Sequence, residues 1–124
     1  MSNIKTEIWE REFNLPIIIK QFKDKEITDI QKEAVECFMN NLDIVDSAKK
    51  NVEEYVINNG LSETGKNSVD NIFKYVIPKS IYIPKEKKRV VAIMCNYKFD
   101  LEHGISIIFE EEKFKTVGPQ DLIL

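Results

Sequence analysis

The sequence predicts an α+β domain, an antiparallel β-sheet with two to three helices packed on one face. Segments rich in β-branched and aromatic residues lie at both ends of the chain, and segments with helical apolar spacing lie between them. The two kinds of segment do not alternate one for one, which argues against a doubly wound parallel sheet. With 124 residues the chain is expected to be a single domain, residues 1–124, able to bury its own core.

Two strands are expected at the N-terminus, because β-branched and aromatic residues gather around Ile8 and over Leu15–Ile19. Residues Arg11–Asn14 are predicted to form the turn between them. Pro16 cannot donate a ladder hydrogen bond, so the second strand is expected to start there or to lie at a sheet edge. A polar turn over residues 23–26 then leads into the helical part of the chain.

Two helices are predicted next. Thr28 and Gln31 have the spacing of a capping box, in which each side chain satisfies the backbone N–H of the other residue. Apolar residues then recur at helical spacing as far as Leu42. Asp43 is expected to cap a second helix that ends at Gly60. The inner face of that helix is predicted to carry Val45, Ala48, Val52, Tyr55 and Val56.

The chain after residue 66 is predicted to form a short helix and then to return to the sheet. Asn67 or Ser68 is expected to cap this helix, and Pro78 is expected to end it. Ser80–Ile83 is predicted as a short strand and Phe114–Val117 as the final one. The inward side chains of the short helix are predicted to be Val69, Ile72, Phe73 and Val76.

A β-hairpin is predicted over Arg89–Glu112, where two apolar strands flank a polar loop, Asp100–Gly104. A register that pairs Phe99 with Ile105 keeps the apolar side chains of both strands on one side of the sheet. The loop then has the length of a common hairpin connection, and Gly104 is expected to supply the unusual backbone dihedral that ends it.

Composition and charge narrow the classes of function. The net charge of −3 provides no basic field for phosphate backbones, so no nucleic-acid partner is expected. The chain has no apolar signal segment and no membrane-length apolar run, so a cytoplasmic protein without a membrane partner is predicted. Cys37 and Cys95 fall on predicted apolar faces, which favours free buried thiols over a disulfide or a nucleophile.

The candidate chemistry lies in the hairpin loop, at Asp100, Glu102 and His103. Two carboxylates and an imidazole are suited to a divalent metal or to acid–base catalysis. However, neighbouring loop residues point in different directions, and the chain has no second histidine to complete a typical zinc site. Such residues also favour turns for structural reasons. We therefore assign no catalytic residue, metal or cofactor, and keep the three residues as candidate binding residues.

The hairpin and the segment after it carry a recognisable pattern, an aromatic residue followed by Asp-x-Glu-His-Gly, an apolar strand and a Val-Gly-x-x-Asp turn. This signature resembles a family of small uncharacterised bacterial domains in which the aromatic residue is usually tryptophan. The resemblance covers the C-terminal half and implies a bacterial cytosolic α+β domain. Similar small proteins are candidate immunity proteins of toxin systems. The matching residues are Phe99, Asp100, Glu102, His103, Gly104, Ile105, Phe109, Val117, Gly118 and Asp121.

Three hypotheses for the function follow. The first is a non-catalytic protein-binding domain of the bacterial cytosol, an immunity-type protein that neutralises a toxin. The alternative is a metal-dependent or acid–base enzyme that uses Asp100, Glu102 and His103. The third is a structural subunit of a larger assembly. A protein partner is expected under the first and third hypotheses, and the sequence leaves the oligomeric state open.

Overall fold

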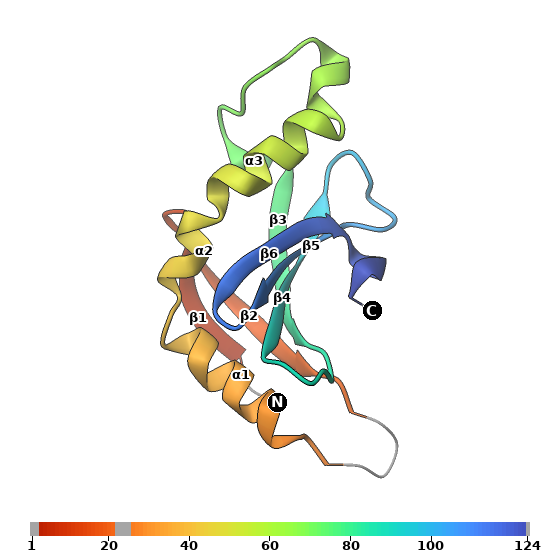
Figure 1. Cartoon of the computed structure of the whole chain (residues 1–124). Helices are drawn as coiled ribbons and strands as arrows, with labels where there is room; N and C mark the ends of the chain where they lie inside the picture. The colour runs from red at the N-terminus through yellow and green to blue at the C-terminus, as the bar shows by residue number, and fades with distance from the viewer. Residues whose placement is uncertain (1–2, 22–25, 124) are drawn as a thin grey trace.

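The structure is a computed structural model that describes residues 3–21 and 26–123. Within these residues the chain forms a six-stranded sheet in the order β1-β2-β3-β4-β5-β6, antiparallel except for the parallel pair β2–β3 (Figure 1). The α+β class is confirmed. The strands are β1 Asn3–Ile8, β2 Arg11–Ile19, β3 Val76–Ile83, β4 Val90–Tyr97, β5 Ile105–Glu110 and β6 Lys113–Pro119. The helices are α1 Asp29–Met39, α2 Asp43–Ser47 and α3 Lys49–Asn58, with 3₁₀ turns η1 Leu61–Thr64, η2 Ile72–Lys74 and η3 Gln120–Leu122.

The turn between β1 and β2 lies at Trp9 and Glu10, so the prediction of a turn at Arg11–Asn14 was wrong. Both turn residues have positive φ angles, 51° and 71°, as a two-residue type I′ hairpin turn requires. Tertiary contacts compensate for this conformation at a bulky residue. The Trp9 side chain is buried, and its Nε1 donates a hydrogen bond of 2.9 Å to the Val45 carbonyl.

Strand β2 exchanges one neighbour for another at Pro16. Pro16 is paired with Asn3 at the end of the β1 ladder, and the parallel pairing with β3 begins at Ile17. Pro16 therefore lies inside a strand that starts at Arg11, which corrects the expectation of a strand start or a sheet edge. The missing N–H falls where the pairing changes sides. The polar turn expected at residues 23–26 lies, apart from Glu26, outside the described residues.

Helix α1 begins with the predicted capping box. The Thr28 hydroxyl accepts a hydrogen bond of 3.2 Å from the Gln31 amide, and the Gln31 side-chain oxygen accepts one of 3.0 Å from the Thr28 amide. Gln31 is also buried, and its Nε2 donates to the Lys20 carbonyl at 2.7 Å. The cap therefore fixes the start of the helix to the end of β2 as well as closing its own backbone.

The predicted second helix is divided into α2 and α3 at Ala48. Asp43 is the first residue of α2, and Leu42 occupies the N-cap position without a side-chain hydrogen bond. The helix ends before Gly60, as expected. Of the predicted inner face, the residues that are fully buried are Val45, Ala48, Val52 and Val56, and Tyr55 is half-buried.

The short helix predicted after residue 66 is replaced by the 3₁₀ turn η2, which Asn71 caps through a hydrogen bond to the Phe73 amide. Val76 already belongs to β3 and is paired with Tyr97. Pro78 lies within this strand, next to an irregularity in the register. Residues whose apolar spacing alone predicted a helix are thus part of β3, because they pair with β4.

The β4–β5 hairpin pairs Cys95 with Ile105, so the predicted pairing of Phe99 with Ile105 was wrong. Both registers keep odd-numbered residues on one side of the sheet, and apolar alternation cannot distinguish them. Contacts with β3 decide the register. Strand β4 remains paired with β3 to its end, and the Lys98 amide just beyond it donates a hydrogen bond of 2.8 Å to the Tyr75 carbonyl. Residues 98–104 are left as the connection.

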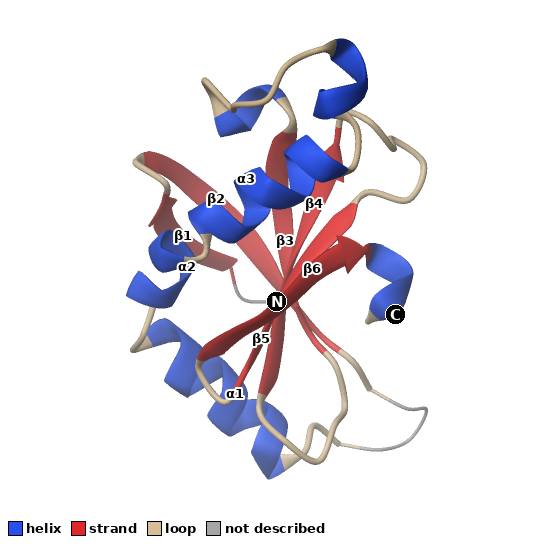
Figure 2. Cartoon of the chain, turned by 45° about the horizontal axis from the view of Figure 1, so that its top comes forward, coloured by secondary structure: helices blue, strands red, loops and turns tan. Residues whose placement is uncertain are grey.

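The buried apolar residues form a main cluster and a smaller one. The main cluster joins side chains of the helices, such as Phe38 and Val52, to side chains of the sheet, such as Ile93 and Ile107. The smaller cluster consists of Tyr82, Val90, Ala92, Met94 and Ile108, with Ile123 packed against it. Figure 2 shows the strands as a twisted fan that crosses the middle of the molecule. None of the helices in the described part of the chain is long and apolar enough to cross a membrane.

Candidate functional site

The β4–β5 connection is a loop held by its own hydrogen bonds. The Asp100 carboxylate accepts a hydrogen bond of 3.1 Å from the His103 amide, and the Gly104 amide donates to the Asp100 carbonyl at 2.9 Å. The Asp100 amide in turn donates to the Tyr97 carbonyl. A side chain that accepts from a backbone amide a few residues ahead is the usual means by which aspartate closes a turn. The loop is therefore closed by hydrogen bonds within its own residues and to the end of β4.

The Asp100 carboxylate also binds the imidazole of His103. The ring Nδ1 lies 3.1 Å and 3.2 Å from the two carboxylate oxygens, and it donates because an ionised carboxylate only accepts. The hydrogen bond and the charge of Asp100 raise the pKa of His103, with smaller contributions from Glu102 and Asp121. The hydrogen bond from the His103 backbone, followed by the interaction with its ring, lowers the pKa of Asp100.

Phe99, the aromatic residue of the signature, anchors the loop to the body of the protein. Its ring stacks on Tyr75, with centroids 5.7 Å apart, and meets Tyr97 edge-on at the same distance. The Tyr97 hydroxyl donates a hydrogen bond of 2.7 Å to the Asn59 carbonyl at the end of α3. A Cβ on Gly60 would lie 2.4 Å from the Phe99 ring, so the chain after α3 passes directly over it.

The two separate segments of the signature meet at one end of the sheet. Gly104 has a φ of +63°, which confirms the predicted role of this glycine. A Cβ at this position would lie 2.5 Å from the Cys95 carbonyl oxygen and 2.7 Å from Nε2 of Gln120. Gln120 begins η3 and lies within the second signature segment, and its Nε2 donates to the Cys95 carbonyl at 3.1 Å. Asp121, the next residue, contributes to the raised pKa of His103.

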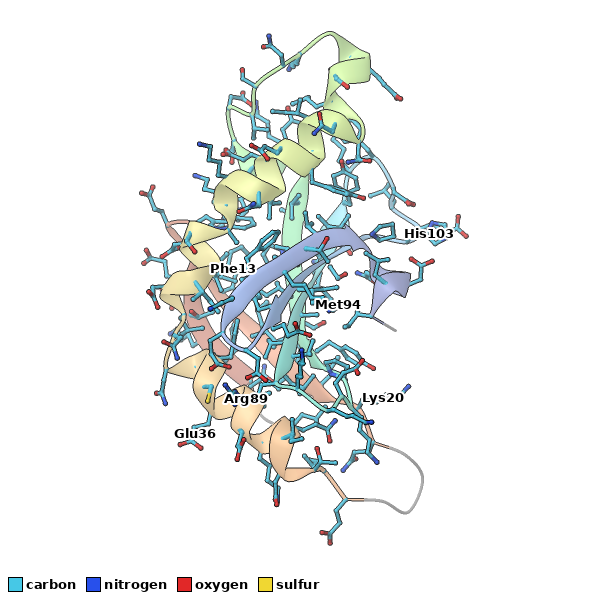
Figure 3. All side chains as sticks on the ribbon, viewed as in Figure 1. Phe13, Lys20, Glu36, Arg89, Met94 and His103 are labelled. Carbon is cyan, nitrogen blue, oxygen red and sulfur yellow. The ribbon has the colours of Figure 1, made fainter. Side chains whose placement is uncertain are left out.

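The most exposed large apolar side chain among the described residues lies in this loop. Leu101 is 79% exposed and is flanked by Asp100 and Glu102. The side chain of His103 is 58% exposed and lies at the margin of the molecule (Figure 3). We call Asp100, Leu101, Glu102, His103 and Asp121 the loop surface. Sequence reasoning missed Leu101, although an aliphatic residue among turn-forming polar residues was the signal that marked it.

The structure brings together only two of the three candidate residues. Asp100 and His103 are in contact, whereas Glu102 makes no hydrogen bond or ion pair with the described residues and acts on His103 through its charge. Within residues 3–21 and 26–123 no group of three or more histidine, cysteine or acidic side chains is placed to hold a metal ion. The geometry is that of a turn whose carboxylate orients an imidazole.

The other residues considered for chemistry have structural contacts. Cys95 is fully buried, and burial raises the pKa of its thiol, which disfavours the reactive thiolate. Both cysteines are free, and Cys37 is half-buried. Arg89, just before β4, forms ion pairs with Glu111 and Glu112 on the β5–β6 turn. The pairs join the start of β4 to the end of β5.

The fold and the loop define the class as an α+β domain with a mostly antiparallel sheet and a self-closed hairpin connection that carries the signature. Residues 2–124 match the family described as a Domain of unknown function (DUF6985), and the chain belongs to this family. The match spans nearly the whole chain, whereas the resemblance seen in the sequence covered its C-terminal half. Neither the curated proteins nor the solved structures contain a match to the chain.

Proposed function

We propose that this chain is a non-catalytic protein-binding domain of the bacterial cytosol, an immunity-type protein that neutralises a toxin, and that it binds its partner through the loop surface. The observation that carries the proposal is Leu101, an aliphatic side chain 79% exposed on a loop fixed by internal hydrogen bonds. A rigid loop loses little conformational entropy on binding, so an apolar anchor presented on it contributes more of its burial free energy to affinity.

The acidic residues of the loop surface favour a partner whose contact region is basic. Asp100 and Glu102 flank Leu101 in the sequence, and both carboxylates, together with that of Asp121, act on nearby His103, so negative charge lies beside the anchor. Complementary charge raises the association rate and excludes partners of the wrong sign. An apolar centre with a charged rim is the ordinary organisation of a protein interface.

We further propose that the helices pack on one face of the sheet, whereas the loops and the C-terminal turn lie on the other face. The two separate apolar clusters support it, because only the main cluster contains helical side chains. In Figure 1, α1, α2 and α3 follow one another from the lower left to the upper part of the molecule, and the C-terminal turn lies on the right. The alternative, an enzyme using Asp100, Glu102 and His103, has less support because Asp100 is engaged by the backbone of its own loop.

The test begins with affinity capture from the native cells and with the product of the neighbouring gene as a candidate partner. The wild-type chain is expected to retain one partner at a stoichiometric ratio. Leu101→Ser is expected to raise the Kd for the captured partner at least tenfold in calorimetry, because the apolar anchor is lost without a change in charge. Met39→Ser is the matched control, since Met39 is another exposed apolar side chain, 45% exposed, on α1.

A growth assay tests the immunity-type role. Co-expression with the captured partner is expected to protect a sensitive host when the chain is wild type or Met39→Ser, and to fail with Leu101→Ser. Recovery of no stoichiometric partner by the wild-type chain would refute the binding function. Equal binding by the two variants would place the interface elsewhere on the molecule.

A further inference from the structure

A groove of about 530 Å³ lies over strands β4, β5 and β6. Its floor is formed by Val90 and Ile108 of the smaller apolar cluster and by Thr116 of β6. The β3–β4 loop borders it with Glu86, Lys87 and Lys88, the ends of β5 and β6 border it with Glu110 and Lys115, and the C-terminal turn borders it with Leu122 and Ile123. None of these residues belongs to the loop surface. We call this feature the sheet groove.

An apolar side chain at the border of the sheet groove remains exposed. Val90 and Ile108 are buried among their neighbours, but Leu122 at the border is 58% exposed. A ligand with an aliphatic side chain would cover Leu122 and remove further apolar surface from water, which is favourable in proportion to the area covered.

The border carries Lys87, Lys88 and Lys115 against Glu86 and Glu110, which leaves a net positive charge. Lys87 and Lys88 make no ion pair with the described residues, whereas Lys115 is paired with Glu110 at 3.3 Å. Arg89, the next basic residue along the chain, is ion-paired with Glu111 and Glu112 on the β5–β6 turn. In a chain of net charge −3, this border is therefore a place where carboxylates of a partner are attracted.

The shape favours a segment of a macromolecule over a small molecule. The volume lies within the range of roughly 300–1,000 Å³ that is typical of small-ligand sites, but such sites bury about 70–90% of their ligand. The sheet groove lies on the surface of the sheet between the β3–β4 loop and the C-terminal turn, so its occupant would keep one side exposed. An extended peptide does so naturally, because alternate side chains point to opposite sides.

We propose that the sheet groove is a second docking site, which binds an extended peptide segment of a partner protein through aliphatic side chains followed by acidic ones. The aliphatic residues lie against Leu122, and the acidic residues lie against Lys87 and Lys88. The proposal is independent of the function assigned to the loop surface, because the two sites share no residue.

The experiment uses the full chain labelled with ¹⁵N and three acetylated, amidated peptides. The sequences are Gly-Leu-Ile-Glu-Asp-Gly, Gly-Leu-Ile-Lys-Lys-Gly and Gly-Ser-Ser-Glu-Asp-Gly, so that charge and apolarity are removed one at a time. The first peptide is expected to shift the amide signals of Val90, Ile108 and Thr116 in a saturable manner. The other two are expected to bind at least tenfold more weakly.

Charge-reversed variants locate the site. The double variant Lys87→Glu and Lys88→Glu is expected to weaken binding of the acidic peptide at least tenfold. The double variant Lys50→Glu and Lys66→Glu changes the net charge equally at exposed positions away from the groove and is expected to bind as the wild type does. Retention of the dispersed amide spectrum shows that each variant is folded. Leu101→Ser is expected to bind the peptide normally, which separates this site from the loop surface.

Three outcomes would overturn the proposal. The first is equal binding of the acidic and basic peptides, or no saturable shift with the acidic one. The second is a set of shifts that maps outside the groove. The third is a change of the Val90 and Ile108 signals with protein concentration in the absence of peptide, which would make a second copy of the chain the occupant.

Discussion

The side-chain amide of Gln120 donates a hydrogen bond of 3.1 Å to the backbone carbonyl of Cys95, and this contact joins the C-terminal turn to the strand that leads into the signature loop. Gly104 lies directly beside it, with no room for a Cβ. The arrangement explains why a glycine and a turn some fifteen residues apart belong to one structural unit. It also fixes Asp121, the residue after Gln120, within electrostatic reach of His103.

Gly104→Ala is expected to destabilise the protein more than Gly65→Ala. Both glycines have positive φ angles, +63° and +86°, so both substitutions carry a backbone strain of about 1–3 kcal/mol. Only Gly104 is crowded, because nothing lies within 4 Å of a Cβ built on Gly65. Overpacking at Gly104 adds a further 1–3 kcal/mol, roughly, to the loss in the free energy of unfolding. Urea denaturation of the two variants measures the difference.

A double-mutant cycle shows whether Gln120 is the crowded neighbour. In Gly104→Ala combined with Gln120→Ala, the amide that the new methyl group would meet is gone. The loss of stability is expected to be smaller than the sum of the two single losses by about 0.5 kcal/mol or more, the usual size for residues in contact. Additive losses would mean that only the Cys95 carbonyl opposes the new methyl group.

The pKa of His103 is expected to lie above 6.5 in the folded protein and to fall in Asp100→Asn. The imidazolium gains the charge and the hydrogen bond of Asp100, and the amide of asparagine supplies no charge. An NMR titration of the imidazole signals measures both values directly, because the chain has a single histidine. A pKa at or below 6.5 in the wild type would contradict the contact.

The contribution of this pair to stability has a defined pH window. The raised pKa of His103 means that its contribution is fully present below pH 6.5 and is lost as the pH rises through the folded value. The lowered pKa of Asp100 means that its contribution is present above pH 3.8 and is lost as the pH falls through the folded value. The stability difference between wild type and Asp100→Asn is therefore expected to be largest between these limits.

The Cys95 thiol is expected to stay unreactive until the protein opens. It is fully buried, and burial raises its pKa, so little thiolate forms near neutral pH. In a Cys37→Ser variant, labelling by a disulfide reagent is expected to be slower than in denaturant by about 100-fold or more, because it requires local or global unfolding. Fast stoichiometric labelling of the native variant would contradict the burial.

Gln31→Met is expected to lower the free energy of unfolding by about 1–3 kcal/mol, since it leaves the Lys20 carbonyl and the Thr28 amide without their side-chain partner. Methionine has a similar length, so the loss reflects hydrogen bonds more than a cavity. Thr28→Ser is the matched control, because it retains the hydroxyl that accepts from the Gln31 amide and is expected to cost little. Thermal and urea unfolding measure both variants.

The features that the structure places differently from the sequence prediction share one physical cause. Trp9 occupies a turn because its indole is buried and hydrogen-bonded to Val45, a residue far along the chain. Phe99 leaves the hairpin ladder because Tyr75 and the end of α3 receive its ring. Each local pattern allowed two arrangements, and contacts between distant segments selected one of them.

The candidate site was only half visible in the sequence. The residue types at Asp100, His103 and Gly104 pointed to a closed turn, because aspartate caps backbone amides and glycine tolerates positive φ. The partner of Gly104 was not visible, since Gln120 is one polar residue among many until the fold places it beside Cys95.

The sequence by itself determined the features that depend on short-range chemistry, namely the α+β class, the capping box at Thr28 and Gln31, and the glycine-closed loop at Gly104. Only the tertiary structure decided the register of the central hairpin, the change of neighbour at Pro16 and the meeting of the two signature segments. The physical reason is range. Caps and turns are fixed by atoms a few residues apart, whereas register and docking depend on apolar area and hydrogen bonds that exist only once the sheet is assembled.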